Sequence, residues 1–451
     1  MRFALSLFDY NILELRPHFP GYPIFCFFAK IIYLIIGSVQ LTFSIIGGIS
    51  IFIIIFYSNL IFEMIISKKS YYLSSLLFIN PLLWNLSNRY MSDLFGLSLL
   101  MMVTYYFLLY VNSRNERHLF IALFILGLLA GVRISFLPFF IPLFFFVSFL
   151  SSKKLFFISS LFLLLGTMIW MIPLILITGI DNLYSISNNH IMGHFYKWGG
   201  SVLTSNSSYY FRFIKLLESI WADGMGGFWT GRHFITLLVS IGWIFSFFFS
   251  IPNSYKLINH KSKILIRLLI ASIISYIIWV FLFQNIIYKP RHIIPFIPFI
   301  LMLSSVGLIS ILRISKSFQI FIFSFFICLL IITTYLNWQH KSPSALSQVK
   351  SYIIKDKSSL KIFYSSELIN TYMKKHKGSK NIIFKSAEHL DDIKNYYDSG
   401  YIIYSTKNLN HLDLNLELEN IFYHNPYVNR LWSTMQIYKY KKIKLGLVPP
   451  I

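Results

Sequence analysis

Apolar runs recur along the chain from position 41 to position 336, each of about 20 residues, the length that lets a helix cross a bilayer core of about 30 Å. Short polar segments separate them. The pattern predicts ten spanning helices, two of them short enough to be tilted or broken pairs. Their expected ranges are 41–66, 71–87, 92–111, 118–132, 134–150, 155–179, 231–251, 264–288, 292–313 and 317–336.

Composition agrees with a membrane protein. Hydrophobic residues make up 56% of the 451 residues and charged residues 13%, whereas soluble domains carry about 25% charged residues. The formal charge of +23 raises the question of nucleic acid, but no basic stripe is interleaved with base-stacking aromatics, so we expect no nucleic-acid partner. Cys26 and Cys328 lie in apolar stretches without metal or disulfide spacing, so we expect no redox chemistry.

Cations in the short loops indicate the orientation. If the spans alternate, these cations fall on one side of the membrane, which the positive-inside rule makes the cytoplasm. They are Lys68, Lys69, Arg114, Arg117, Lys153, Lys154, Lys256, Lys261, Lys263, Arg313 and Lys316. We therefore expect a multi-pass protein of the plasma membrane with membrane lipids around it.

The segment RPHFPGYPIF, Arg16 to Phe25, interrupts this apolar chain with prolines, a glycine and a histidine. A span from Phe19 to Gly37 would flip every later helix, so we expect a helix lying at the outer interface. Its Pro-Gly-Tyr-Pro start suits this, because proline is tolerated in a first helical turn and tyrosine favours the headgroup level. Residues 1–40 then form an outer loop, and both termini lie outside.

Two further regions are polar. A loop at 180–230 is expected on the outer side of the transmembrane domain, which we place at 41–340. Residues 341–451 are predicted to form a soluble, extracytoplasmic α/β domain with a mainly parallel sheet. Its strands are expected at 361–366, 381–385, 400–406 and 435–440, and its helices near 346–355, 366–374 and 388–397. No glycine-rich phosphate loop accompanies them.

Four segments together resemble a known superfamily. FALSLFDY followed by RPHFPGYPIF is similar to the first outer loop of multi-spanning glycosyltransferases of the C-type fold, which include protein O-mannosyltransferases and aminoarabinose transferases. NPLLWNLSNRYMSDLFGL, GLLAGVRISFLPFFIPL and KPRHIIPFIPFI are similar to patterns of a bacterial branch. The resemblance covers roughly residues 3 to 312. It implies a mostly α, polytopic helix bundle in a bacterial inner membrane.

The resemblance also implies a function: transfer of a sugar from a polyprenyl-phosphate donor to a lipid, glycan or protein acceptor at the outer face, with inversion. Such chemistry needs a carboxylate for the acceptor hydroxyl, cations for the departing phosphate, and a groove for the isoprenoid tail. In the family, an aspartate lies a few residues before the segment that matches Arg2 to Leu5. Here the position of that aspartate falls at or before Met1. We therefore expect the first family helix to be missing, through an upstream gene start or an inactive, truncated form.

Three residues near the front are the catalytic candidates. Asp9 is the first remaining acid, and Glu14 is the second. Asp9 could equally cap the interfacial segment or pair with Arg16. His18 could hydrogen-bond substrate or simply fix the proline turn. Arg16 and Tyr22, from the same segment, are counted as substrate-binding candidates.

The phosphate candidates are cations that the topology places at outer helix ends, against the usual charge bias. They are Arg89, Arg133, Lys289, Arg291 and His292. Snorkelling to lipid headgroups is the alternative for the first two. Asp93 is included because its carboxylate, at i, i+4 spacing from Arg89, could neutralise the charge of that arginine.

His190, His194 and Lys197 share a helical spacing in the long loop. They could contact acceptor or sugar phosphate. HxxxH spacing also suits metal ligands, but without a nearby carboxylate we assign no metal site; a divalent cation stays possible. Nearby aromatics could stack on sugars or form an interfacial belt.

Two other functions compete with the glycosyltransferase. A transporter or flippase would place ionisable residues near the midplane and often shows internal repeats, whereas these charges gather at helix ends. A catalytically inactive relative is the third reading, because the expected aspartate is absent.

Overall fold

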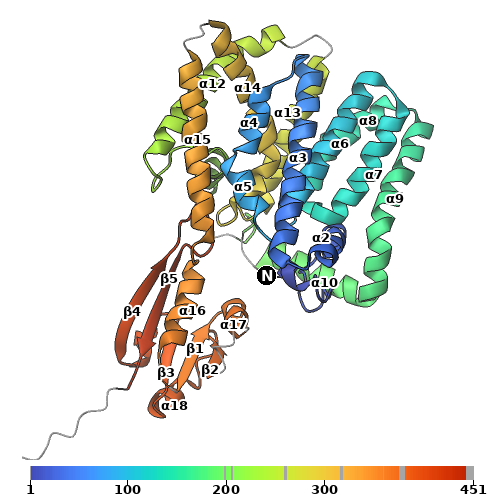
Figure 1. The fold of residues 1–451 in the computed structure, drawn as a ribbon. Coiled ribbons are helices and arrows are strands. Elements are labelled where there is room, and N and C mark those ends of the chain that lie inside the picture. The colour runs from blue at the N-terminus through green and yellow to red at the C-terminus, as the bar shows by residue number, and fades with distance from the viewer. Residues whose placement is uncertain are drawn as a thin grey trace, which may run out of the picture. The chain divides into compact units, whose positions relative to one another are not determined.

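The computed structural model describes residues 2–197, 200–204, 207–257, 262–314, 318–358, 360–374 and 381–442. The chain forms two compact units, Met1–Asn337 and Trp338–Ile451. The elements described in the first unit are helices, and the second unit carries the sheet (Figure 1).

Helices of the first unit follow the apolar runs of the sequence. In chain order they are α1 (Arg2–Leu5), α2 (Pro23–Ile36), α3 (Val39–Ile66), α4 (Tyr71–Phe78), α5 (Pro81–Ser87), α6 (Asp93–Ser113), α7 (Glu116–Arg133), η1 (Ile134–Phe140), α8 (Ile141–Leu150), α9 (Lys153–Thr178), α10 (Ile180–Met192), η2 (Gly193–Lys197), α11 (Tyr209–Glu218), η3 (Ser219–Gly224), α12 (Ile235–Leu257), α13 (Ser262–Phe283), η4 (Pro290–Phe296), α14 (Ile297–Ile314) and α15 (Phe318–Lys341).

Within the described residues, seven helices are long and apolar enough to cross a membrane. This count differs from the expected ten at three places. The run 71–87 is broken into α4 and α5 at Asn80, whose side chain caps α5 just before Pro81. The runs 118–132 and 134–150 follow one another through the 3₁₀ segment η1 and are therefore counted as one element, Glu116–Leu150. The chain nevertheless turns back between them, because the Ser151 hydroxyl after α8 lies 2.8 Å from the Tyr110 hydroxyl near the end of α6. The helix α12 continues to Leu257, but only its part Ile235–Ser250 enters this count, because several side chains beyond Ser250 lie outside the described residues.

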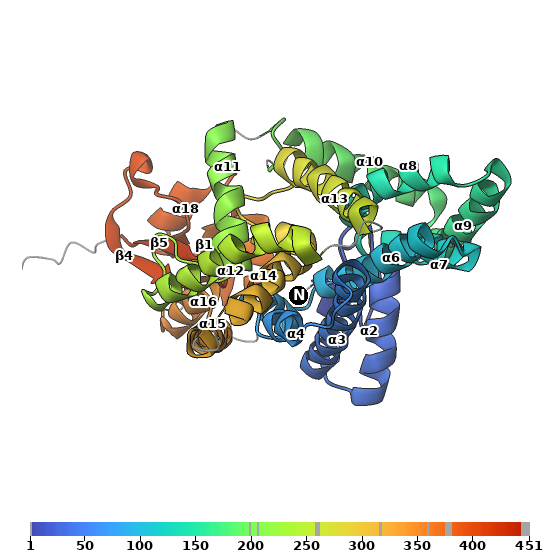
Figure 2. The same ribbon diagram turned by 90° about the horizontal axis from the view of Figure 1, so that it is seen from above.

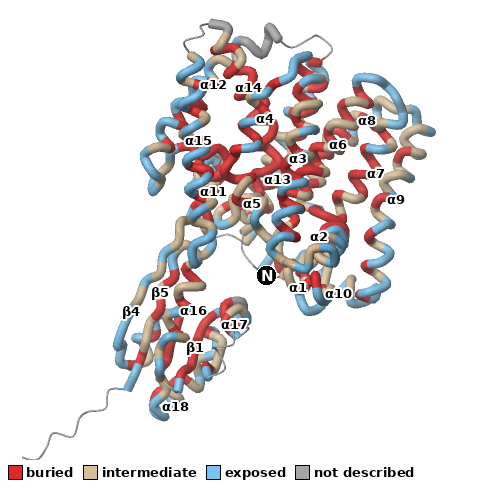
Figure 3. Tube along the Cα trace, in the orientation of Figure 1, coloured by how far each residue is buried: buried red, intermediate tan, exposed pale blue. Residues whose placement is uncertain are grey.

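The spans differ in how deeply they are enclosed. Pro290–Leu312 has 83% of its apolar window buried, whereas Lys153–Thr178 has 22%. Figure 3 shows the same contrast between the centre of the bundle and the exposed outer helix α9. An arginine at the start of Pro290–Leu312 is therefore carried on the most enclosed element, and that position needs a compensating partner.

The first unit has a basic end and a polar-loop end. The basic end holds the α3–α4, α6–α7 and α8–α9 turns, with Lys68, Arg114 and Lys153. Lys261 and Lys316, and the side chains of Lys256 and Arg313, lie outside the described residues. The polar-loop end holds the start of α6, the end of α7 and the whole stretch from α10 to η3.

The N-terminal segment contains a short helix and a turn before α2. Figures 1 and 2 show α2 running across the end of the bundle, not along the length of α3. Gly21 lies at φ +88°, and a Cβ there would meet Ile12 and the Tyr10 hydroxyl at 2.6 Å. Tyr10 Oη donates to the Gly21 carbonyl at 2.9 Å, so the turn is tied to the chain before it.

The polar stretch 180–230 is largely helical. It contains α10, two π-helical turns, η2 and η3, and α11. Arg212 of α11 is 1% exposed, and its guanidinium donates to the carbonyls of Phe281 and Gln284 at the end of α13. A guanidinium that donates to the terminal carbonyls of a helix stabilises that end and anchors this stretch to the bundle.

Neighbouring helices meet at glycines. A Cβ on Gly307 of α14 would lie 1.7 Å from the Ser246 carbonyl oxygen of α12, and one on Gly47 of α3 would lie 2.2 Å from the Ser87 carbonyl oxygen of α5. Small residues allow backbones to approach this closely inside a membrane, where packing replaces the hydrophobic effect.

The second unit is a small α/β domain. Its helices are α16 (Ala345–Lys355), α17 (Glu367–Lys374) and α18 (Ile393–Asp398), with the short η6 (Asn410–Leu412). Its strands are β1 (Lys361–Ser365), β2 (Ile382–Ser386), β3 (Ile402–Ser405), β4 (Leu416–Tyr423) and β5 (Thr434–Tyr440). The sheet order is β2-β1-β3-β5-β4. The pairs β1–β2 and β1–β3 are parallel, β5 is antiparallel to β3, and β4, absent from the expected strands, pairs antiparallel with β5.

The adjacent glycines of α3 provide a matched test of the packing. Gly47→Ala places a methyl group against the α5 backbone, whereas Gly48→Ala points into open space. We expect G47A to lower stability by about 1–3 kcal/mol, the usual result of overpacking. G48A should be neutral or stabilising by up to about 1 kcal/mol through helix propensity. Thermal unfolding in detergent measures both, and equal melting temperatures for the two variants would contradict the close packing.

Candidate functional site

Asp93 is the centre of the polar-loop end. It is the first residue of α6 and is 1% exposed. A carboxylate in the first turn of a helix interacts favourably with the helix dipole, but that contribution alone does not offset the loss of water. Asp93 therefore requires cationic partners from elsewhere in the chain.

Two arginines supply the counter-charge. Arg133 Nη2 lies 2.8 Å from Asp93 Oδ1, and Arg291 Nε lies 3.6 Å from the same oxygen. Arg133 ends α7 and Arg291 is in the first turn of η4, so three helix ends meet at one carboxylate. Gly96 makes room for this, because a Cβ there would lie 2.9 Å from Arg133 Cβ.

Asp93 and Arg89 do not share a helix. The i, i+4 spacing suggests one helical face, but α5 ends at Ser87 and α6 begins at Asp93. Their charges still interact, and burial together with Arg291 lowers the pKa of Arg89 to about 10 while Asp93 and Asp223 oppose the shift. The direct partners of Asp93 are thus Arg133 and Arg291.

Lys289 joins these arginines. Burial and the charges of Arg291 and Arg133 lower its pKa to about 8. We call Arg89, Arg133, Lys289 and Arg291 the cationic cluster. Its charge exceeds that of the carboxylates that act on it, so the cluster is suited to attract an anion. Four of the cations predicted from the sequence are therefore together at one end of the bundle.

His18 and Tyr22 are next to the cationic cluster. Tyr22 Oη and His18 Nε2 are 3.0 Å apart, and the His18 ring meets Phe3 edge-on with centroids 5.8 Å apart. Burial, followed by the charges of Arg2 and Arg291, lowers the pKa of His18 to about 3. His18 is therefore neutral at physiological pH and offers hydrogen bonds, not charge.

Asp9, Glu14 and Arg16 form an exposed group of their own. Arg16 Nη1 lies 2.5 Å from Asp9 Oδ2, and Arg16 also pairs with Glu14. Asn11 and Arg16 bond each other through their backbones, and Asn11 Oδ1 accepts from the amides of Leu13 and Glu14. The pairing of Asp9 with Arg16, the alternative considered from the sequence, is the arrangement observed.

The histidines of the long stretch lie on α10 and η2. The rings of His190 and His194 are parallel with centroids 6.4 Å apart, and Phe19 is 5.0 Å from His190. Burial, then His194 and Lys289, lowers the pKa of His190 to about 4. Lys197 is exposed at the end of η2. Among the described residues, no group of three His, Cys, Asp or Glu side chains is arranged to hold a metal.

His292 follows Arg291 but takes part in helix packing. It is 7% exposed, and its carbonyl accepts from the Tyr276 hydroxyl at 3.2 Å. That bond links η4 to α13. Arg291 therefore belongs to the cationic cluster, whereas the next residue, His292, contributes to the packing of η4 against α13.

Asp223 and Arg2 were missed by the sequence reasoning. Asp223 is 4% exposed on η3, and its charge acts on Arg89. Arg2, in α1, acts on His18 and Lys289. An acid inside the apolar stretch Ser219–Met225 was a usable signal, since charged residues are rarely buried without a partner.

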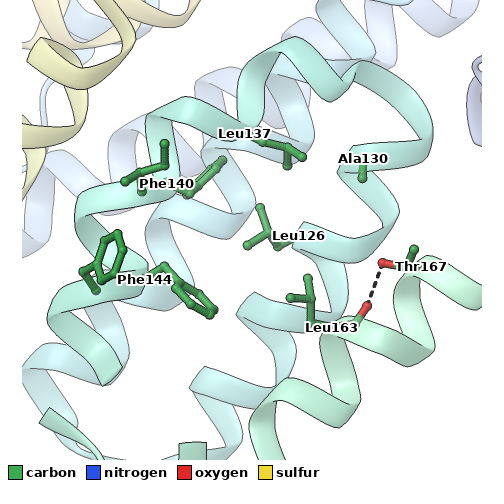
Figure 4. Close-up of a pocket in the computed structure, with 9 residues that line it drawn as sticks. Leu126, Ala130, Leu137, Phe140, Phe144, Leu163 and Thr167 are labelled. Carbon is green, nitrogen blue, oxygen red and sulfur yellow. Dashed lines mark hydrogen bonds between the residues drawn. The ribbon is translucent and has the colours of Figure 1, made fainter. Parts of the chain in front are cut away.

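An apolar pocket opens within one turn of Arg133. It has a volume of about 320 Å³ and lies between α7, η1, α8 and α9. Figure 4 shows aromatic and aliphatic side chains around it, and the one hydroxyl labelled there, Thr167 Oγ1, donates to the Leu163 carbonyl at 2.9 Å. Ala130 and Leu137, which line it, flank Arg133 on either side along the chain.

Comparisons with known proteins identify the fold. No protein-family model matches the sequence, and a search of curated proteins finds no match. The structure is similar to ArnT from Cupriavidus metallidurans bound to undecaprenyl phosphate, with a TM-score of 0.53 and 9% identity, over 92% of this chain and 87% of that chain. Apo ArnT gives a TM-score of 0.51 and 9% identity, over 97% and 92%.

ArnT is an aminoarabinose transferase with the C-type glycosyltransferase fold. The expected polytopic helical bundle with a small α/β domain is therefore confirmed. At this level of identity the likeness concerns the fold.

Asp93→Asn tests the buried ion pair. The change keeps the shape but leaves Arg133 and Arg291 without their counter-charge, and breaking a buried pair costs about 3–5 kcal/mol. We expect a lower melting temperature in detergent and a reduced yield of folded protein. Asp9→Asn is the control, because its pair with Arg16 is exposed and such pairs contribute about 0–1 kcal/mol. A D93N protein as stable as D9N would contradict this account.

Proposed function

We propose that this chain is a membrane glycosyltransferase of the C-type fold that uses a polyprenyl-phosphate-linked sugar donor at the outer membrane face. The observation that carries the proposal is the cationic cluster, which gathers at one end of an ArnT-like bundle around Asp93. ArnT itself is described with undecaprenyl phosphate bound.

The phosphate of the donor is assigned to the cationic cluster. Guanidinium groups bind phosphate oxygens through short charge-assisted hydrogen bonds. Arg133 and Arg291 are held by Asp93, so little reorganisation is needed when an anion arrives. Because negative charge grows on the phosphate as the sugar leaves, fixed cations also stabilise the transition state.

The isoprenoid chain is assigned to the pocket beside Arg133. Its lining is almost wholly apolar, and it lies between α7, η1, α8 and α9. A lipid with its phosphate on Arg133 would need its first isoprene units within one or two helical turns of that residue. Ala130 and Leu137 are at that spacing.

The acceptor hydroxyl requires a proton acceptor. The hydroxyl oxygen of the acceptor forms the new bond to the anomeric carbon of the sugar, and the bond from that carbon to the phosphate oxygen breaks. The hydroxyl proton passes to a carboxylate. Asp9 is proposed for this step, with Glu14 as the second candidate. The ion pair between Asp9 and Arg16 must open first. An anionic donor would favour this opening by attracting Arg16.

The reading as a transporter or flippase has less support. The cationic cluster lies at helix ends, where α7 stops and η4 starts, whereas transport sites lie near the bilayer midplane. The basic end, with Lys68, Arg114 and Lys153, is assigned to the cytoplasm. The cationic cluster, α10 and the second unit are then assigned to the outer side.

Binding of undecaprenyl phosphate tests the proposal. We expect it to raise the melting temperature of the detergent-solubilised protein, since a ligand at 100 times its Kd stabilises by about 2.7 kcal/mol. Undecaprenol, which lacks the phosphate, should have little effect. Arg291→Gln should abolish the difference and also sugar transfer in membranes, whereas Arg114→Gln at the basic end should keep both.

Two results would contradict the proposal. One is equal stabilisation by undecaprenyl phosphate and undecaprenol. The other is wild-type sugar transfer in R291Q. Arg291→Lys separates charge from geometry, because lysine keeps the charge but cannot form a bidentate contact, so partial binding is expected.

Lys289 gives the binding a pH dependence. Burial and the neighbouring arginines lower its pKa to about 8, so it is protonated below that pH and loses its charge above it. Phosphate monoesters are dianionic above about pH 7, since their second pKa is about 6. The Kd of undecaprenyl phosphate should therefore rise as the pH passes through about 8. Lys289→Arg should remove the rise; an unchanged pH profile in that variant would exclude Lys289 from the site.

A further inference from the structure

The guanidinium of Arg291 is held at two of its three nitrogens. Nε lies 3.6 Å from Asp93 Oδ1, and Nη1 donates to the thioether sulfur of Met91, Sδ, at 3.1 Å. The third nitrogen, Nη2, has no hydrogen-bond partner among the described residues, and the side chain is 21% exposed. A planar group held at two points keeps one orientation, so Nη2 is the nitrogen left to meet a ligand.

The position of Met91 is set by the linker between α5 and α6. The Met91 amide donates to the Arg89 carbonyl at 2.8 Å, which closes a tight turn. On one side of Met91, the Tyr90 ring stacks on Phe43 of α3 with centroids 4.8 Å apart. On the other side, Ser92 is fully buried at the start of α6. With both neighbours fixed, the linker presents the thioether at a defined place beside η4.

A thioether orients Arg291 without cancelling its charge. Asp93 already neutralises part of the cationic cluster, because its Oδ1 also lies 2.8 Å from Arg133 Nη2. A second carboxylate in the place of Met91 would compete with an incoming anion for the guanidinium. The thioether sulfur is neutral and polarizable and accepts a hydrogen bond only weakly. It can therefore direct the guanidinium while the positive charge stays available to a ligand.

We propose that Met91 is a positioning residue of the anion site: its sulfur accepts from Arg291 Nη1 and, together with Asp93, turns Nη2 toward the phosphate. The inference rests on the proposed function and deepens it. Met91 acts through Arg291 and need not touch the ligand. The entropy of ordering the Arg291 side chain is then lost on folding and not on binding, which raises the affinity for the anion.

Two substitutions of Met91 separate hydrogen bonding from packing. Met91→Leu keeps the volume and apolar character but removes the acceptor, so the Kd of undecaprenyl phosphate should rise about three- to tenfold, the effect of losing one hydrogen bond. Met91→Gln is polar but restores an acceptor at a similar distance from the backbone, so its Kd should stay within about twofold of wild type. A residue that acted only through apolar packing would show the opposite order.

A cycle with Arg291→Lys tests whether Met91 acts through the guanidinium. Lysine carries one ammonium and no planar fork to orient, so adding M91L to R291K should change the Kd by no more than about twofold. Met101→Leu is the matched control, because it makes the same exchange at a fully buried position of α6. M101L should bind undecaprenyl phosphate as wild type does, and melting temperatures in detergent should not separate it from M91L.

The outcomes separate the inference from the proposed function. Wild-type affinity in M91L, weaker binding in M91Q than in M91L, or an equal loss from M91L in the wild-type and R291K backgrounds would each overturn the positioning role while leaving phosphate binding intact. A wild-type protein that does not distinguish undecaprenyl phosphate from undecaprenol would overturn the proposed function itself. If M91L does not fold, Met91→Ala takes its place: binding weaker than in M91Q supports the role, and wild-type affinity overturns it.

Discussion

The burial of one carboxylate governs the polar-loop end of the bundle. Asp93 is removed from water at the start of α6, and an isolated buried charge is far too costly for a protein that is only marginally stable. The end of α7 and the start of η4 must therefore come close enough to present Arg133 and Arg291. Once those ends are joined, the positions of Lys289 and Arg89 follow from the chain around them. The charge of the cationic cluster is a consequence of how the helices are held together.

Much of the fold could be predicted from hydrophobic runs, because a span of about 20 apolar residues has few alternatives in a chain this apolar. Where prediction fell short, the cause was local. Asn80 caps a new helix and Pro81 starts it, which divides an apparently continuous run. The stretch 180–230 was interpreted as a loop because it is polar, yet it contains the helices α10 and α11. Strand β4 has acids at alternate positions and an exposed face, so its apolar pattern is weak.

The site shows a similar division between local and long-range information. Alternation of the predicted spans alone places Arg133 and Arg291 at the same end, since Arg133 follows the span 118–132 and Arg291 precedes the span 292–313. Which carboxylate pairs with which cation depends on tertiary geometry: the Arg89–Asp93 spacing spans a gap between two helices, and the partner of Asp93 is 40 residues further along. The buried position of Asp223 could not be found from sequence, because it depends on the turn η3, whose end is bonded by Asn80 and Trp243.

Strand β4 forms one border of the sheet in the second unit, and its outer side has no neighbouring strand among the described residues. Open borders of this kind invite another chain to add a strand. Glu417 and Glu419 interrupt its apolar positions, and Glu417 lies 3.9 Å from both Lys439 and Lys441 on β5. The ladder is also irregular between Leu416 and Leu418. Charge and distortion together discourage self-association through this border, so crowded copies of the protein can remain separate in the plane of the membrane.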